Sequence, residues 1–339
     1  MHAWEIISGD GVDALHLGER ERPIPGPGQV RVRMNANSIN YRDLITIEGA
    51  GARKLPFSIV PNSDGAGVIT AVGEGVKLKE GDRVTSCFFE EWIAGEITAP
   101  VMASALGGPR QGVLAEEVIL LEDGVIPTPT GLTDEEAATL PCAALTAWHA
   151  LTLPRPVKAG ETVLLLGTGG VSVFAQQFCT MMGARTIVTS SSDDKLEKMK
   201  ALGASEVINY RTNPEWDAAV LELTGGSGVD RVVEVGGPGT FDRSVNAVRV
   251  GGIIGLIGVL TGVSGATNPT PIMGKSITVK GIYVGSRTMF ADMNRAIEAH
   301  NLKPVIDQTF DFKDARLAYH AMRGAGHFGK LVIKYSEGT

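Results

Sequence analysis

The chain has little cysteine and no excess of positive charge. Its three cysteines, Cys87, Cys142 and Cys179, are far apart and include no C-x-x-C pair, which argues against a disulfide framework and a structural zinc site. The formal net charge is −7 at pH 7. We therefore expect no nucleic-acid partner, because such binding needs a basic face.

Long hydrophobic runs are also missing. The longest apolar stretch, around residues 251–260, is too short and too rich in glycine to span a membrane. The first ten residues lack a basic segment followed by an apolar run, so we expect no signal peptide and a cytoplasmic protein. The 339 residues, 43% of them hydrophobic, suffice for two domains of ~150 residues, each with its own core.

Two patterns divide the chain. Up to about residue 125, short runs of β-forming residues are separated by glycine turns, with strands expected at 30–34, 67–72 and 82–87. From Thr162 onward, apolar strands alternate with helices, which predicts a doubly wound parallel sheet covered on both faces. The six strands are expected at 163–166, 186–189, 206–210, 231–235, 253–258 and 277–284. The tail is expected to form helices at 289–300 and 313–322 and a strand at 330–335.

A glycine-rich loop follows the first strand of this alternating region. It consists of Gly167, Thr168, Gly169, Gly170, Val171 and Ser172, and a helix begins within it. Glycine is needed where the chain turns sharply and where backbone approaches a pyrophosphate, and the helix N-terminus offers free N–H groups to the phosphates. The context predicts a dinucleotide site, although Ser172 replaces the usual third glycine. The alternative is a glycine-rich turn that binds nothing.

The end of the second strand bears on the choice of cofactor. Ser190 and Ser191 stand where an NAD enzyme usually places an acidic residue for the ribose, and Lys195 follows. Tyr210 closes the next strand. We expect these four residues to bind the 2′-phosphate of NADPH. The alternative is that the aspartates at 193–194 hold the ribose of NAD, although we expect them to cap the helix that they begin.

Several segments resemble the medium-chain dehydrogenase/reductase family. They lie at 36–43, 61–68, 72–84, 137–148, 167–172 and 279–285, and they cover nearly the whole chain in that family's order. The resemblance implies a β-rich, GroES-like catalytic domain, residues 1–127 and 285–339, with a Rossmann domain, residues 128–284, inserted in it. The first boundary of the inserted domain stays open within residues 128–150. It also implies a homodimer formed by edge pairing of the strand at 277–284.

The residue types at the family's metal positions argue against zinc. Zinc-dependent members carry Cys where Asn40 stands, His-Glu where Ser63 and Asp64 stand, and a further Cys at the position of Cys142. Catalytic zinc needs three protein ligands drawn from Cys, His, Asp and Glu, and of that ligand set this chain keeps only the last cysteine. The four cysteines of the family's structural zinc lobe are absent from residues 88–112 as well.

The chain thus resembles the zinc-free, quinone-oxidoreductase-like branch. In that branch the residues matching Asn40 and Thr146 lie beside the nicotinamide, and those matching Lys195 and Tyr210 bind the 2′-phosphate. A basic residue of the tail can also approach the cofactor, and here the segment 327–330, which contains His327 and Lys330, precedes the last strand.

Without zinc, no strong Lewis acid polarises the substrate. A quinone or an α,β-unsaturated carbonyl suits such a site, since it needs only orientation and a hydrogen bond to the developing oxyanion. The candidate donors are Asn40, Tyr41 and Thr146, and Tyr41 is also a candidate proton donor. Alternatively, Tyr41 packs in the core and Asn40 ties a turn through its amide.

Other segments complete the predicted site. Backbone at the carboxyl ends of two sheet strands is expected to flank the nicotinamide, with plain core as the alternative. These positions are Gly258, Val259, Tyr283, Val284 and Gly285. Phe88, Phe89 and Trp92 shape the substrate cleft or form core.

The sequence therefore predicts an NADPH-dependent, zinc-independent oxidoreductase that transfers hydride to a small activated carbonyl compound. One alternative is an alcohol dehydrogenase or aldehyde reductase with another proton relay in place of zinc. The other is a weakly catalytic NADPH-binding sensor or structural protein, against which the intact segment 40–43 argues.

Overall fold

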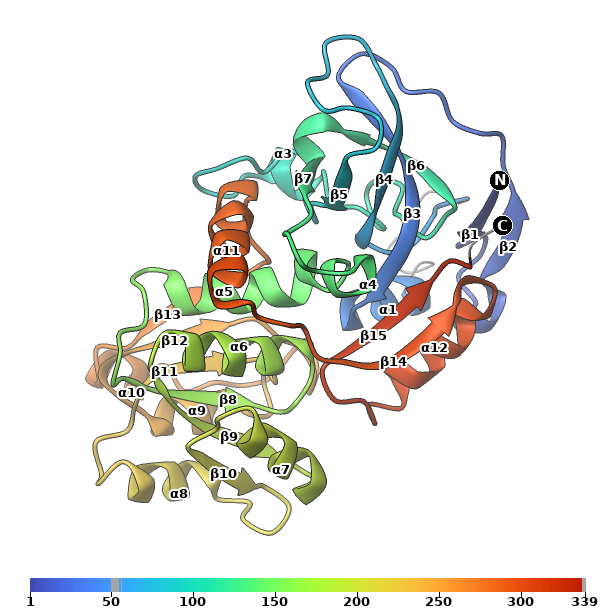
Figure 1. Ribbon diagram of the computed structural model, residues 1–339. Coiled ribbons are helices and arrows are strands. Elements are labelled where there is room, and N and C mark those ends of the chain that lie inside the picture. Colours follow the sequence, from blue (N-terminus) through green and yellow to red (C-terminus); the bar gives the residue numbers. More distant parts are fainter. Residues whose placement is uncertain (50–54, 56, 337–339) are drawn as a thin grey trace. The chain divides into compact units, whose positions relative to one another are not determined.

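The computed structural model describes residues 1–49, 55 and 57–336 (Figure 1). The chain forms two compact units. The first contains residues 1–145 and 285–339, and the second contains residues 146–284. Among the described residues, no helix has the length and apolar character needed to cross a membrane.

The second unit starts at residue 146, within the region 128–150 where the sequence left the domain boundary open. Residues 128–145 pack within the first unit because their polar groups bind there. Asp134 accepts a hydrogen bond from Asn35 Nδ2 at 2.7 Å and pairs with Arg83. The backbone N–H of Cys142 donates to Asp64 Oδ2 at 3.0 Å.

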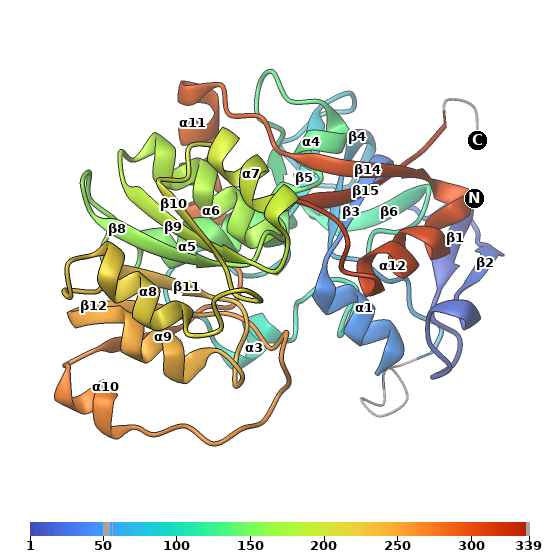
Figure 2. The ribbon, with the colours of Figure 1, turned by 90° about the horizontal axis from the view of Figure 1, so that it is seen from below.

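The second unit is a parallel sheet with helices on both faces, as predicted. The strand order is β10-β9-β8-β11-β12-β13, and all neighbours are parallel. Helices α6 and α7 cover one face, and α8 and α9 cover the other (Figure 2). The strands are β8 (Thr162–Leu166), β9 (Arg185–Ser190), β10 (Glu206–Asn209), β11 (Val229–Glu234), β12 (Val248–Leu256) and β13 (Thr278–Gly281). The helices are α5 (Leu145–Thr152), which begins in the first unit, α6 (Gly170–Met181), α7 (Asp193–Ala201), α8 (Trp216–Leu223), α9 (Phe241–Ala247) and α10 (Thr270–Gly274).

The first unit is built on an antiparallel-rich sheet drawn from both ends of the chain. Within the described residues its strand order is β14-β15-β3-β4-β5-β7, with β6 paired to β3. Strands β1 (His2–Glu5) and β2 (His16–Glu19) form a separate pair. The sheet strands are β3 (Gln29–Ile39), β4 (Asp64–Val72), β5 (Arg83–Ser86), β6 (Glu117–Leu121), β7 (Val125–Pro127), β14 (Ile306–Asp311) and β15 (Lys330–Lys334).

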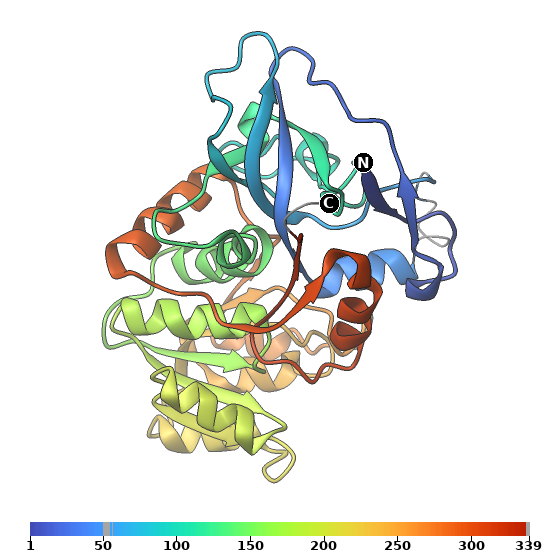
Figure 3. The same cartoon turned by 45° about the vertical axis from the view of Figure 1, so that its right-hand side comes forward.

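Helices at both ends of the chain pack on this sheet. Near the N-terminal end, α1 (Tyr41–Glu48) follows β3. Near the C-terminal end, α12 (Ala315–Arg323) lies beside α1 (Figure 3). The remaining helices are α3 (Ala99–Met102), α4 (Asp134–Ala137), the π-helical turn Leu140–Ala144 and α11 (Arg287–His300).

Strand β13 is shorter than predicted. It ends at Gly281, whereas the sequence pattern predicted a strand to residue 284. Val284 has φ 54, in the left-handed region, which a strand cannot contain. The sequence pattern also missed β14, since three of its six residues are exposed in a row and no apolar alternation marks it.

Candidate active site

The loop after β8 has the geometry of a phosphate-binding turn. Gly167 lies in the left-handed region at φ 73, where a side chain is disfavoured, and Gly169 is the N-cap of α6. A Cβ added to either glycine would meet no other atom within 4 Å. The first N–H groups of α6 lack intrahelical acceptors, so the open space over the loop suits an anionic group.

Ser172 has a structural reason to replace the third glycine. Its buried hydroxyl donates to the carbonyl oxygen of Leu166, the last residue of β8, at 2.6 Å. The backbone N–H of Gly167 donates to Thr189 O at 2.8 Å. These two bonds hold the loop between β8 and β9.

The residues predicted to bind the 2′-phosphate gather at one edge of the sheet. Ser190 ends β9, and Tyr210 directly follows β10, with its N–H donating to Ser190 O at 3.0 Å. Ser191 follows on the chain, and Lys195 lies in the first turn of α7. The structure thus places Ser190, Ser191 and Tyr210 at the carboxyl ends of two neighbouring strands, with Lys195 in the helix that follows the first of them.

The predicted cap of α7 is wrong. Ser192, rather than either aspartate, is the N-cap, and its Oγ accepts from the Lys195 N–H at 3.4 Å. A short hydroxyl at an extended residue reaches this N–H, while the aspartates already lie in the helical turn. Asp193 accepts from Asn209 Nδ2 at 2.7 Å.

A buried carboxylate that sequence reasoning missed shapes the end of β11. Glu234 accepts hydrogen bonds from the N–H groups of Gly236 and Gly237 at 2.8 and 3.0 Å, and from the Ser244 hydroxyl. A Cβ on Gly258 would stand 1.7 Å from Val235 O, so no side chain fits there. In the sequence, the turn after β11 is marked by the consecutive glycines Gly236 and Gly237, which follow an apolar strand.

The segment after β13 is held by a histidine. His149 Nδ1 lies 2.7 Å from the Val284 carbonyl oxygen. Burial lowers the pKa of His149, so the neutral ring donates through Nδ1–H at neutral pH. A β-branched residue in the left-handed region is strained, and such strain is common at ligand sites. This favours Val284, with the exposed Tyr283 before it and Gly285 after it, as functional backbone.

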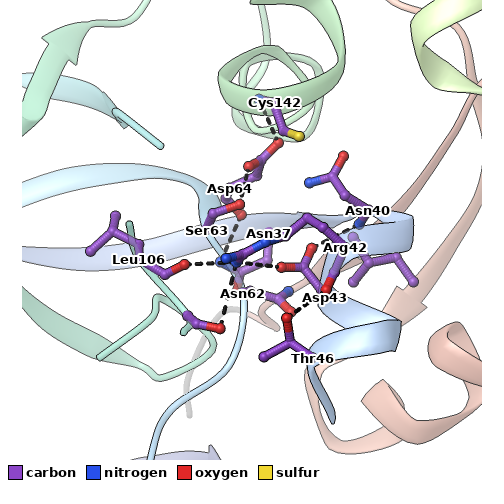
Figure 4. A network of polar contacts seen from close by, with 12 residues as sticks. Asn37, Asn40, Arg42, Asp43, Thr46, Asn62, Ser63, Asp64, Leu106 and Cys142 are labelled. Carbon is purple, nitrogen blue, oxygen red and sulfur yellow. Dashed lines mark hydrogen bonds and ion pairs between the residues drawn. The ribbon is translucent and has the colours of Figure 1, made fainter. Parts of the chain in front are cut away.

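Asn40, the first predicted catalytic residue, caps α1 in the first unit. Its backbone N–H donates to Asp43 Oδ2 at 2.9 Å. Arg42 pairs with Asp43 at 3.1 Å and also donates to Leu106 O at 2.7 Å (Figure 4). The turn is thus a capping box, in which the Asn40 side chain faces the Asp43 N–H and the Asp43 side chain accepts from the Asn40 N–H.

The Asn40 amide lies in a buried polar cluster, defined here as Asn40, Asp64, Cys142 and Lys330. Lys330, at the start of β15, donates from Nζ to Ile39 O at 2.9 Å and to Asn40 Oδ1. Lys330 is only 3% exposed and Asn40 only 7%. Within the described part of the chain, Asn40 Nδ2 has no hydrogen-bond partner of good geometry, but the Asn40 amide interacts with the Asp64 carboxyl and opposes the rise in its pKa that burial causes. From the sequence, the tail segment that contains Lys330 was connected only with the cofactor. The contact of Lys330 with Asn40 had one signal in the sequence, a lysine as the first residue of an apolar strand.

The electrostatics of the cluster are set by burial. Asp64 accepts from the Ser63 hydroxyl at 2.6 Å and from the Cys142 N–H. Desolvation raises the pKa of Asp64 to about 6, although the Lys330 charge opposes this. Burial also raises the pKa of the Cys142 thiol and lowers that of Lys330. Among the described residues, no three His, Cys, Asp or Glu side chains are grouped to hold a metal ion.

The remaining predicted side chains divide between solvent and core. Tyr41, the first residue of α1, is 39% exposed, which excludes the alternative that it packs in the core. Thr146 is buried in the first turn of α5, in the second unit. Phe88, Phe89 and Trp92 are buried and pack edge to face, so they form core in the first unit.

Comparison with known proteins identifies the family. Residues 26–130 match the family model of the alcohol dehydrogenase GroES-like domain, and residues 170–299 match that of the zinc-binding dehydrogenases. A zinc-type alcohol dehydrogenase-like protein of Schizosaccharomyces pombe is 42% identical over 308 residues, 89% of each chain. A solved structure from Sinorhizobium meliloti, described as an alcohol dehydrogenase, is 40% identical to this chain. Its TM-score is 0.91, and the match covers 98% of each chain.

Two further solved structures differ in cofactor. One is named an NAD-dependent alcohol dehydrogenase and is 33% identical, with a TM-score of 0.90 over 99% of this chain and 100% of that one. The other is a mycobacterial protein in complex with NADPH, 27% identical, with a TM-score of 0.83 over 98% of this chain and 99% of that one. The chain belongs to the medium-chain dehydrogenase/reductase superfamily and is an oxidoreductase of that family.

The raised pKa of Asp64 predicts a pH-dependent stability. Because the folded state favours the protonated carboxyl, its stabilising contribution is full below about pH 4 and is lost as the pH rises through about 6. Relative to Asp64→Asn, the wild-type free energy of unfolding should fall by about 2 kcal/mol from pH 4 to pH 7. Urea denaturation at a series of pH values measures this, with the exposed Asp307→Asn as the matched control. A wild-type-to-variant difference that stays constant with pH would contradict the prediction.

Proposed function

We propose that the protein is an NADPH-dependent reductase of quinones or α,β-unsaturated carbonyl compounds that works without catalytic zinc. The observation that carries the proposal is the buried Asn40 amide. Its oxygen is bound by a lysine, and its –NH2 group faces the Asp64 carboxyl without a hydrogen bond of good geometry in the described residues. A buried donor that is only weakly engaged suits an oxygen that becomes negative during reduction.

The second unit supplies the features for NADPH. The open loop from Gly167 to Val171 would hold the pyrophosphate, and the cluster of Ser190, Ser191, Lys195 and Tyr210 would hold the 2′-phosphate. The competing choice, NAD, usually has a carboxylate at the end of the second strand for the ribose. Here β9 ends at Ser190 and the two aspartates lie in the first turn of α7, which supports NADPH. The NADPH complex of the mycobacterial relative agrees with this choice, while the NAD-dependent relative represents the alternative.

The donor set supports the absence of catalytic zinc. Of the four positions where zinc-dependent members place ligands or their neighbours, Asn40 is bound by an ammonium group and Ser63 donates to Asp64. Asp64 and Cys142 remain, and two such residues fall short of the three protein ligands of a catalytic zinc site. The positive charge of Lys330 beside them further disfavours a metal cation.

The chemistry assigned to the residues is simple. Bound NADPH supplies the hydride. Asn40 Nδ2 donates to the acceptor oxygen, and the exposed Tyr41 hydroxyl is the candidate proton donor. An aldehyde is less activated and would need stronger polarisation than an amide provides. The names of the alcohol dehydrogenase relatives favour alcohol–aldehyde chemistry as the second candidate function.

Cofactor and acceptor tests check the proposal directly. Purified protein is titrated with NADPH and NADH by fluorescence, and cofactor absorbance is followed with 1,4-benzoquinone, an enone and an aldehyde. We expect tighter binding of NADPH and oxidation by the quinone or enone, with Tyr41→Phe slowing the enone reaction about tenfold or more if Tyr41 supplies the proton. Preference for NADH would overturn the assignment of Lys195 and Tyr210, and turnover of the aldehyde alone would overturn the substrate class.

The phosphate loop gives a sharper test of the cofactor site. Gly169 has φ −79 and ψ −178, which valine adopts readily, and open space over its Cα. Gly169→Val should therefore leave thermal stability unchanged but weaken NADPH binding about tenfold or more, because the side chain fills the pyrophosphate space. Gly274→Val, at a second open glycine of the same unit, is the control. Equal NADPH affinity in wild type and Gly169→Val would place the pyrophosphate elsewhere.

We also propose that the protein is a homodimer joined at the outer edge of β13. Within the described residues β13 pairs only with β12, and the segment that connects these two strands carries exposed apolar side chains. They are Leu260, Val263 and Met273, with exposed fractions of 53%, 85% and 76%. Unpaired edges and clustered apolar side chains favour association with a second copy.

Sedimentation measures this dimer. Wild type should sediment at about twice the chain mass of 35.7 kDa, and Val263→Asp should shift it toward the monomer because a charge would be buried. Leu317→Asp, at an exposed apolar residue of the first unit, is the control and should remain dimeric. A wild-type monomer, or a Val263→Asp dimer as tight as wild type, would refute the interface.

A further inference from the structure

Lys330 reaches the buried cluster because two distant strands pair. Leu331 of β15 lies opposite Ile39 of β3 in the antiparallel register, so Lys330 stands next to the residue where β3 ends and α1 begins. Its Nζ donates to Ile39 O and to Asn40 Oδ1. Burying an ammonium group is costly, and this position holds it with two acceptors and the nearby charges of Asp64 and Asp43.

The lysine decides which way the Asn40 amide faces. An asparagine amide has an accepting oxygen and a donating nitrogen that can exchange places by rotation. Because an ammonium group only donates, it accepts no bond from Nδ2 and binds Oδ1 instead. The –NH2 group is therefore the end of the amide that Lys330 does not bind, and it lies on the side of Asp64 and Cys142 (Figure 4). It has no hydrogen bond of good geometry among the described residues, and its interaction is with the Asp64 carboxyl.

The lysine also changes the strength of that donor. Hydrogen bonds in a chain polarise one another, and a positive charge at Oδ1 draws electron density from the amide nitrogen. Charge-assisted hydrogen bonds are stronger than neutral ones, the more so where water is excluded. The N–H groups of Asn40 are thus better donors to an oxyanion than those of an isolated amide.

We propose that Lys330 is a positioning residue for carbonyl reduction, which orients and polarises the Asn40 amide toward the acceptor oxygen. The inference rests on the proposed reductase function. In that reaction bound NADPH would supply the hydride for a new C–H bond on the acceptor carbon, and the π electron pair would move to the oxygen that the Asn40 amide faces. NADPH is oxidised to NADP⁺, the acceptor is reduced, and a proton from water or Tyr41 completes the product. Lys330 keeps its proton throughout and acts only through Asn40.

A double-mutant cycle tests this coupling. The variants are Lys330→Met, Asn40→Ala and the double variant, with Lys330→Arg to restore the charge. Lys334→Met, at the exposed end of the same strand, is the control. For each we measure the NADPH dissociation constant by fluorescence, kcat and KM for 1,4-benzoquinone, and the thermal midpoint.

If Lys330 acts through Asn40, the single variants each lower kcat about 10–100-fold and the double variant is no slower than Asn40→Ala. NADPH affinity should stay within about threefold of wild type, and Lys330→Arg should recover much of the lost rate. Should Lys330→Met fail to fold, the comparison of Lys330→Arg with Asn40→Ala decides, since the arginine variant must keep most of the activity that the alanine variant loses.

Three results would overturn the inference. Additive losses in the double variant would mean that the two residues act separately. A tenfold weaker NADPH affinity at unchanged kcat would make Lys330 a cofactor contact. Full activity of Lys330→Met would leave it only a structural role. Absence of turnover by wild type with every acceptor is a different outcome, which refutes the reductase function and this inference with it.

Discussion

The antiparallel pairing of β15 with β3 is the contact on which the first unit and its polar cluster both depend. It joins residues almost 300 positions apart, with Leu331 opposite Ile39 and Ile333 opposite Asn37. Through this pairing the two ends of the chain complete one sheet, and the second unit becomes an insertion within it. The same register brings Lys330 to Asn40. A slip of one residue would turn the lysine to the other face of the sheet, so the fold and the cluster are specified together.

The second unit could be predicted closely because its signals are local. Apolar strands alternating with helices fix a parallel sheet, and the observed order is the doubly wound one. The phosphate-binding loop could be predicted because the backbone conformations of Gly167 and Gly169 themselves favour glycine. The cap of α7 was less predictable, because Ser192 and the two aspartates after it all favour a helix start and only the backbone angles separate them. Likewise, the strained Val284 left no mark in the sequence pattern, which continued the strand through it.

The cluster in the first unit was only partly predictable, because its contacts are non-local. The resemblance to the family identified Asn40, Asp64 and Cys142 as residues at its metal positions, and it thereby implied that they lie close together. The same reasoning placed the segment that ends at Lys330 near the cofactor, whereas the structure buries the ammonium group of this lysine against Ile39 O and the Asn40 amide. No spacing rule connects a lysine at the start of a terminal strand to an asparagine at a helix cap. Short edge strands such as β14 were missed for a related reason, since an exposed strand needs no apolar alternation.

Membership of a family with zinc-dependent members does not fix the chemistry of this chain, because function depends on the site rather than on the fold. The architecture supplies a position beside Asp64 and Cys142 that calls for positive charge, since a buried carboxylate is costly unless it is compensated. A metal ion is one source of that charge and a buried ammonium group is another. The two differ in how they would polarise a substrate oxygen. A metal ion binds the oxygen directly, whereas an ammonium group that is already bound to an amide acts only through the amide's N–H. A site of the second kind polarises its substrate more weakly, and this is the physical reason to expect acceptors that are activated before they bind.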